Sequence, residues 1–260
     1  MIKKKAKNRT LVLNELPPFN VLPYITPDFA KPLLRRVYLP IYRRIWTSRF
    51  VRSMLKRLSG TIVHPDVNSI HEYWINPDSG NLPETYIQGE ERSQFLLEII
   101  RRHEDINAKT LEIGCNIGRN LNYLFKAGFH NLEGIEISNN AVEALKRTYP
   151  EMARNVRIYN TTVEEIITKF KDRQYDVVYT MAVLLHIHND SEWIFPEIAR
   201  ITNSLLVTIE AEWREGWKRF PRNYKNVFEP LGMKQVEELN CGDVRDGFTV
   251  DYVARVFKKR

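Results

Sequence analysis

The chain has 260 residues, of which 43% are hydrophobic and 27% are charged, a composition typical of a globular protein. This length is sufficient for one α/β domain with a full core and an extension. No apolar run of about 18 residues is present, which argues against a spanning helix, and the basic N-terminus lacks a signal-peptide core. Cys115 and Cys241 lie far apart, so we expect no disulfide framework and a cytoplasmic location.

The net charge of +7 is distributed unevenly. Residues 1–60 hold 14 Lys+Arg and 2 Asp+Glu, a net of +12, so the other 200 residues carry −5. Two basic helices, broken at Pro40, are expected within residues 32–58. The second has an apolar stripe between its arginines, which allows contact with an anionic membrane surface. The same stripe fits packing on the domain itself, the interpretation we favour, and contact with nucleic acid or protein stays open.

Residues 61–89 are rich in loop signals, and a helix is expected over Glu90–His103. Strands then alternate with helices, which predicts a doubly wound, mainly parallel sheet in an α/β fold. The expected strands are 109–113, 132–136, 156–160, 175–180, 204–210, 233–239 and 250–257. The expected helices lie near 119–127, 139–148, 163–171, 191–201 and 222–230. The last two strands are joined by a short glycine-containing segment, so they are expected to form an antiparallel hairpin.

The most informative segment is Thr110–Tyr123, T-L-E-I-G-C-N-I-G-R-N-L-N-Y. An apolar strand ends at Gly114, Gly118 follows, and a helical pattern comes next. A second apolar strand ends on Glu136 about 20 residues later, the layout of nucleotide-binding α/β folds. In that layout the Glu136 carboxylate accepts both ribose hydroxyls. The alternative is a charge that only stabilises the following helix N-terminus.

This segment resembles the first motif of the class I S-adenosylmethionine-dependent methyltransferases, acidic-x-Gly-x-Gly-x-Gly. Glu112, Gly114 and Gly118 match the motif, while Asn116 replaces the middle glycine. Asparagine tolerates left-handed backbone better than most residues, so the turn is expected to persist. The resemblance implies a Rossmann-like seven-stranded sheet with a terminal antiparallel hairpin. It divides the chain into a basic extension (1–60), a cap and leading helix (61–106) and a cofactor-binding domain (107–260).

The resemblance also implies a binding site for S-adenosyl-L-methionine. The glycine loop would border the methionine part, and the residues after the third strand would meet the adenine. Thr162 stands where the family usually has an aspartate, and Arg92 would pair with the methionyl carboxylate. The full expected set is Tyr86, Arg92, Glu112, Gly114, Cys115, Asn116, Gly118, Glu136, Ile137, Thr162, Val163, Thr180 and Met181.

The residues after the fourth strand supply candidates for catalysis. Many members of the family read Leu-Glu-His there, so His186 matches and Leu185 departs from the pattern. A base assists methyl transfer when the acceptor is a hydroxyl. Of the two histidines we prefer His188, because it is closer to the exposed Asn189-Asp190 turn. Glu210 and Glu212 could form a metal site with His188, although the spacing is not diagnostic.

The resemblance to enzymes of surface-sugar biosynthesis suggests O-methylation of a sugar, glycolipid or other small molecule. The basic helix would then hold the enzyme near a lipid-linked or anionic acceptor. Two alternatives remain open: an RNA methyltransferase that uses the basic extension, and a non-catalytic, membrane-associated scaffold that binds the cofactor. Against RNA, no N/D-P-P-Y/F tetrapeptide follows the fourth strand. A nicotinamide-dependent enzyme is disfavoured because the third glycine of G-x-G-x-x-G is absent.

Overall fold

The computed structural model describes residues 65–77, 80–213, 215–241 and 252–259. These residues belong to one compact unit of the chain, His64–Arg260. The basic extension and its expected helices at 32–58 lie outside the described residues, so they stay predictions, as do the domain boundaries. Within the described part, no helix is long and apolar enough to cross a bilayer.

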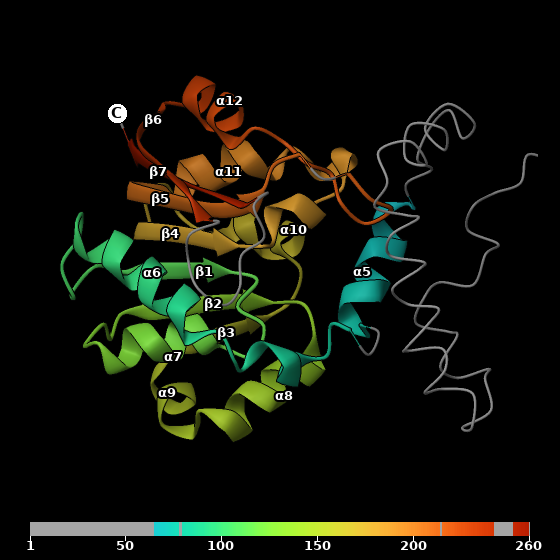
Figure 1. The fold of residues 1–260 in the computed structure, drawn as a ribbon, viewed down its shortest axis with the longest axis vertical. Coiled ribbons are helices and arrows are strands. Elements are labelled where there is room, and N and C mark those ends of the chain that lie inside the picture. Colours follow the sequence, from blue (N-terminus) through green and yellow to red (C-terminus); the bar gives the residue numbers. More distant parts are fainter. Residues whose placement is uncertain (1–64, 78–79, 214, 242–251, 260) are drawn as a thin grey trace, which may run out of the picture. The chain divides into compact units, whose positions relative to one another are not determined.

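The described strands form one sheet of seven, in the order β3-β2-β1-β4-β5-β7-β6 (Figure 1). Their bounds are β1 Thr110–Ile113, β2 Leu132–Glu136, β3 Arg157–Asn160, β4 Tyr175–Met181, β5 Thr202–Ala211, β6 Met233–Asn240 and β7 Tyr252–Lys259. All neighbouring pairs from β3 to β5 are parallel, and β7 is antiparallel to both β5 and β6. The predicted parallel sheet with a C-terminal hairpin is therefore confirmed.

Helices cover both faces of the sheet, and each face has its own apolar cluster. One cluster joins α6 (Glu90–Arg101), α7 (Arg119–Lys126), α8 (Asn139–Thr148) and α9 (Pro150–Asn155) to side chains of the sheet. The other joins α10 (Val163–Ile166), α11 (Ile194–Ile201) and α12 (Tyr224–Phe228) to the opposite face. Because alternate strand residues point to opposite faces, β4 supplies both clusters, with Val177 and Tyr179 in the first and Val178 in the second.

The segment before α6 is more regular than expected. Residues 61–89 read as loop-rich, yet α5 (Val67–Ile75) and a 3₁₀ turn at Pro83–Tyr86 lie there. Asp66 caps α5 by accepting a hydrogen bond from the Ser69 amide at 2.8 Å, which satisfies one of the unpaired N–H groups of its first turn. Figure 1 shows α5 beyond the carboxyl ends of the central parallel strands, where it covers one end of the sheet.

Helix α9 was also missed by the sequence reading. It begins at Pro150 immediately after α8, and its Met152 is fully buried in the first cluster. Proline suits the first position of a helix because its missing N–H has no intrahelical partner there. The helix predicted at 139–148 is confirmed at its bounds, and the other predicted helices are confirmed with shifted ends. The expected 163–171 helix is a short α-helix followed by a 3₁₀ turn at Ile167–Lys169.

Candidate functional site

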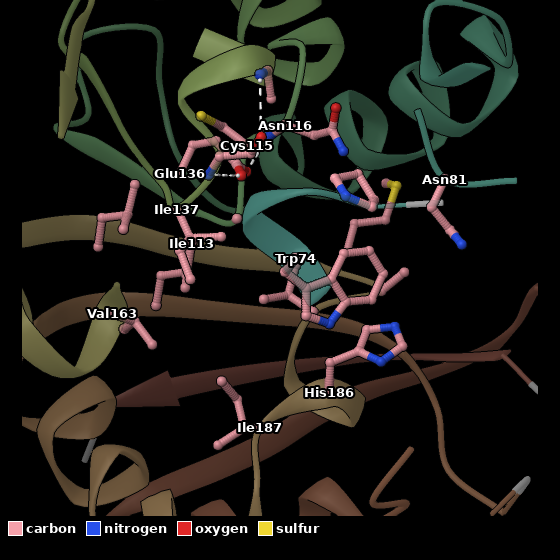
Figure 2. Close-up of a pocket in the computed structure, with 18 of the residues that line it drawn as sticks. Trp74, Asn81, Ile113, Cys115, Asn116, Glu136, Ile137, Val163, His186 and Ile187 are labelled. Atoms are coloured by element: carbon pink, nitrogen blue, oxygen red, sulfur yellow. Dashed lines mark hydrogen bonds between the residues drawn. The ribbon is translucent and has the colours of Figure 1, made fainter. Parts of the chain in front are cut away.

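A pocket with a volume of about 370 Å³ opens at the carboxyl ends of the central strands. It lies where the strand order reverses between β1 and β4, the usual ligand position in open α/β sheets. The loops after β1, β2, β3 and β4 line it, and α5 contributes Ile70, His71 and Trp74. Figure 2 shows Glu136 toward one end of this pocket, with Trp74 and His186 together toward the other.

The glycine loop after β1 has left-handed backbone at three positions. The φ angles are 74° at Gly114, 47° at Asn116 and 77° at Gly118, which confirms that Asn116 substitutes for a glycine. A Cβ at Gly114 would lie 2.5 Å from the Val183 side chain, so this glycine lets the β1 and β4 loops meet. A Cβ at Gly118 would instead meet Leu145 at 2.6 Å. Gly118 therefore serves helix packing and does not line the pocket, unlike the expectation.

Glu136 at the end of β2 faces the pocket and holds the glycine loop. One carboxylate oxygen accepts the Asn116 amide at 2.7 Å and the other accepts the Ser138 amide at 2.8 Å (Figure 2). Burial raises the pKa of Glu136, although these backbone donors oppose the shift. Each carboxylate oxygen has a second lone pair, so the group can accept further hydrogen bonds from a ligand.

Glu112 in β1 is the centre of a second buried network beside the loop. Its carboxyl accepts hydrogen bonds from Asn120 Nδ2 at 2.8 Å and from the Tyr179 hydroxyl at 3.0 Å. Burial raises the pKa of Glu112 to about 8, so the carboxyl is largely protonated at neutral pH. A cationic ligand group placed nearby would favour its ionised form.

Comparison with known proteins supports the predicted family. A family profile described as "Methyltransferase domain" matches residues 111–204, the stretch from β1 into β5 that carries both acidic networks. This match and the relatives below indicate a class I S-adenosylmethionine-dependent methyltransferase domain. Two curated relatives, each a "Ubiquinone biosynthesis O-methyltransferase" of Rickettsia bellii (strains OSU 85-389 and RML369-C), are 26% identical over 165 residues. The alignment covers 57% of this chain and 66% of each relative, just under two thirds of its length.

Solved structures agree on the fold. Geranyl diphosphate C-methyltransferase from Streptomyces coelicolor A3(2) superposes with a TM-score of 0.58 at 11% identity, covering 77% of this chain and all of that one (100%). Magnesium protoporphyrin IX methyltransferase from Synechocystis PCC 6803 gives 0.57 at 14% identity, with 74% and 98% covered. At such low identity these likenesses establish the methyltransferase fold alone.

Several expected cofactor residues of the methyltransferase domain do line the pocket. They include Cys115 and Ile137 in the two loops, Met181 at the end of β4, and Tyr86 and Arg92 from the preceding segment. Val163 lines it as the first residue of α10, and Thr162 does so while its hydroxyl caps that helix, accepting from the Glu165 amide at 3.1 Å. Val163 thus begins a helix and lines the pocket at the same time, and its contact with adenine stays a prediction.

Thr180 does not border the pocket as predicted. It is fully buried and donates its hydroxyl hydrogen to Glu210 at 2.9 Å. Glu210, in β5, also accepts from the amides of Val183 and Leu184 at 3.1 Å and of Leu185 at 3.3 Å. This carboxylate therefore anchors the loop that carries the two histidines. Burial raises the pKa of Glu210 to about 7 against these stabilising donors.

The possible metal site of Glu210, Glu212 and His188 is not formed. Glu210 faces the loop amides, and Glu212 forms a two-point ion pair with Arg255 of β7 at 2.6 and 2.7 Å. Within the described residues, no group of three or more His, Cys, Asp and Glu side chains could hold a metal ion. Glu212 also accepts the Tyr224 amide at 3.2 Å, so it ties the hairpin to α12.

The two histidines both line the pocket, but their ring nitrogens differ. His186 Nδ1 lies 2.7 Å from the Lys218 carbonyl, which can only accept, so Nδ1 carries the hydrogen and Nε2 is the unprotonated nitrogen. His188 Nδ1 lies 3.1 Å from the Asp190 amide, which can only donate, so neutral His188 carries its hydrogen on Nε2. Burial lowers the pKa of His186 to about 3 and keeps this ring neutral.

Trp74 and Lys218 are among the pocket residues that were not predicted from the sequence. Trp74 lies with its ring centroid 4.5 Å from that of His186 (Figure 2). Lys218 lies over the Tyr73 and Trp74 rings at 3.8 and 4.8 Å. Trp217-Lys218 forms the tip of a turn closed by hydrogen bonds between Gly216 and Arg219. The aromatic cluster His71–Trp74 was the available signal, but nothing in the sequence places it against this turn.

Proposed function

We propose that this chain transfers the methyl group of S-adenosylmethionine to a hydroxyl of a small-molecule acceptor. The observation that carries the proposal is one continuous pocket with a ribose-type acid, Glu136, toward one end and a neutral, oriented imidazole, His186, toward the other. Methyl transfer from a sulfonium is an in-line displacement, so holding the nucleophile and the methyl group in line supplies much of the acceleration.

On the cofactor side, Glu136 accepts the ribose hydroxyls while it holds the glycine loop, and Thr162 and Val163 contact the adenine. Glu112 and Asn120 receive the methionine end, with Met181 nearby. Arg119 already donates to Ser93 and to the carbonyls of residues 86 and 88. We assign the methionyl carboxylate to Arg92, which lines the pocket from α6.

On the acceptor side, His186 is the base. Its Nε2 lone pair accepts the hydroxyl proton as the oxygen attacks the methyl group, and the Lys218 carbonyl stabilises the imidazolium that forms. This choice reverses the preference for His188, whose neutral ring presents an N–H at Nε2 as long as Nδ1 caps the following turn. His188 then serves as a donor or as a structural cap.

The acceptor is a ring-bearing compound, for which Trp74 supplies a stacking surface and Ile70, Val183 and Ile187 supply apolar walls. A sugar or a phenol fits this chemistry. The curated relatives carry the name of a ubiquinone-biosynthesis O-methyltransferase, which supports a hydroxyl of a small molecule. Contact of residues 32–58 with a membrane or a lipid-linked acceptor is a separate part of the proposal. It concerns where the enzyme is located and does not bear on its chemistry.

The test incubates the purified chain with methyl-labelled S-adenosylmethionine and fractionated cell extract. Label in small molecules or glycans, lost in His186→Gln, supports the proposal. Label in RNA would identify the RNA methyltransferase instead. Cofactor binding with label in no fraction would point to the non-catalytic scaffold.

A further inference from the structure

The acceptor end of the pocket has a cation whose charge no described residue neutralises. Arg219 lines the pocket and is half-buried. Within residues 65–77, 80–213, 215–241 and 252–259, its side chain has no hydrogen-bond partner and no carboxylate partner. The five guanidinium donors are therefore available to a ligand that supplies acceptors, which would replace the water around them.

The other cations around this wall are already engaged. Lys218 donates to the Tyr73 hydroxyl at 2.5 Å and lies against the aromatic rings of α5. Arg222 is held by Glu192 and by Asn189, both at 2.8 Å. These contacts tie the loop to α5 and to the loop after β4. Arg219 therefore lies in a turn that is held on both sides, next to the positive charge of Lys218.

The positive potential reaches the proposed base. Burial first, and then the charges of Lys218 and Arg219, lower the pKa of His186. A bound anion would offset those charges and make the imidazole more basic when the acceptor is in place. The reaction itself would also benefit, because an anionic acceptor beside a sulfonium pairs opposite charges.

We propose that the acceptor carries an anionic group, a carboxylate or a phosphate, that binds the Arg219 guanidinium while its hydroxyl is methylated. This inference rests on the proposed function and narrows its acceptor class. Arginine suits the role because its planar fork matches both groups in a two-point hydrogen-bonded pair. In this proposal the anionic group only binds and positions the acceptor, and the hydroxyl remains the nucleophile.

The experiment is calorimetric binding to the full chain saturated with S-adenosylhomocysteine. Two matched pairs of probes are used: 4-hydroxybenzoate with 4-hydroxybenzyl alcohol, and glucose 6-phosphate with glucose. At least one anionic probe is expected to bind about tenfold tighter than its neutral partner, as for one charge-assisted pair. Equal affinities within both pairs would overturn the proposal.

Three variants assign the preference to this residue. Arg219→Gln is expected to abolish the tighter binding of the anion, Arg219→Lys to restore part of it, and Arg147→Gln, which removes an exposed arginine of α8, to leave it unchanged. An undiminished preference in Arg219→Gln would contradict the inference. Failure to bind S-adenosylhomocysteine would overturn the proposed function as well. Cofactor binding without a preference for the anionic probes would overturn only the proposed contact between an anionic group and Arg219.

Discussion

The main-chain carbonyl of Lys218 accepts the Nδ1 hydrogen of His186 across 2.7 Å. The turn after β5 thereby sets the orientation of an imidazole on the loop after β4. The Lys218 side chain at the same time contacts Tyr73 and Trp74 of α5. One residue therefore joins the helix that covers the pocket to the group we assign as the base.

Replacing His186 tests that assignment. His186→Gln is expected to lower methyl transfer about 100-fold or more, the usual contribution of a general base, with little change in cofactor affinity. His188→Gln serves as the matched control and is expected to lower the rate far less. The measurement is label transfer at saturating cofactor. A larger loss in the His188 variant would restore the original preference for that residue.

The pH behaviour of His186 gives a second test that needs no acceptor. Because its pKa is lowered to about 3, the folded protein binds fewer protons here than the unfolded chain between about pH 3 and 6.5. Stability from this group should therefore rise with pH across that window. In ¹⁵N-histidine NMR spectra, His186 should keep the neutral Nδ1–H form from pH 5 to 8. Titration of its ring in that range would contradict the buried, carbonyl-held geometry.

The contact between the two loops is tested at Gly114. Gly114→Ala adds a Cβ at 2.5 Å from Val183 in addition to an unfavourable positive φ. Gly232→Ala provides the matched control, because its φ is +82° and nothing lies within 4 Å of the added Cβ. We expect the control to lose about 1 kcal/mol of unfolding free energy and Gly114→Ala to lose about 1–3 kcal/mol more. Equal losses in urea denaturation would mean that the loops do not meet as described.

Cofactor binding should be linked to proton release from Glu112. Because its pKa is about 8, binding of a cationic ligand near pH 7 is expected to displace a proton. Affinity is then expected to rise with pH up to about 8 and to level off above it. Calorimetry in phosphate and Tris buffers measures the release, which should vanish in Glu112→Gln. A binding enthalpy independent of buffer in the wild type would argue against this coupling.

Much of the sheet could be predicted because strand periodicity and turn residues are local signals. Leu132–Glu136 was located at its observed bounds, and the left-handed conformation of Asn116 followed from its side chain. Helix α5 was missed because the aromatic and polar residues of H-E-Y-W resemble a loop, although Asp66 and Ser69 form a helix-capping pair.

The parts of the site that were not predicted depend on tertiary contacts. Glu212 was considered as a metal ligand with Glu210 and His188. The hairpin instead places β7 between β5 and β6 and brings Arg255 against Glu212. The roles of His186 and His188 depend on which backbone group each Nδ1 meets, information that the sequence does not contain. The same holds for Thr180, whose hydroxyl turns toward Glu210 beneath the pocket.

The most direct measurement is calorimetric binding of S-adenosylmethionine to the wild type and to Glu136→Ala, with Glu143→Ala as an exposed control. If Glu136 grips the ribose and fixes the glycine loop, its removal should weaken binding about tenfold or more, while the control binds like the wild type. Wild-type affinity in Glu136→Ala would contradict the cofactor assignment.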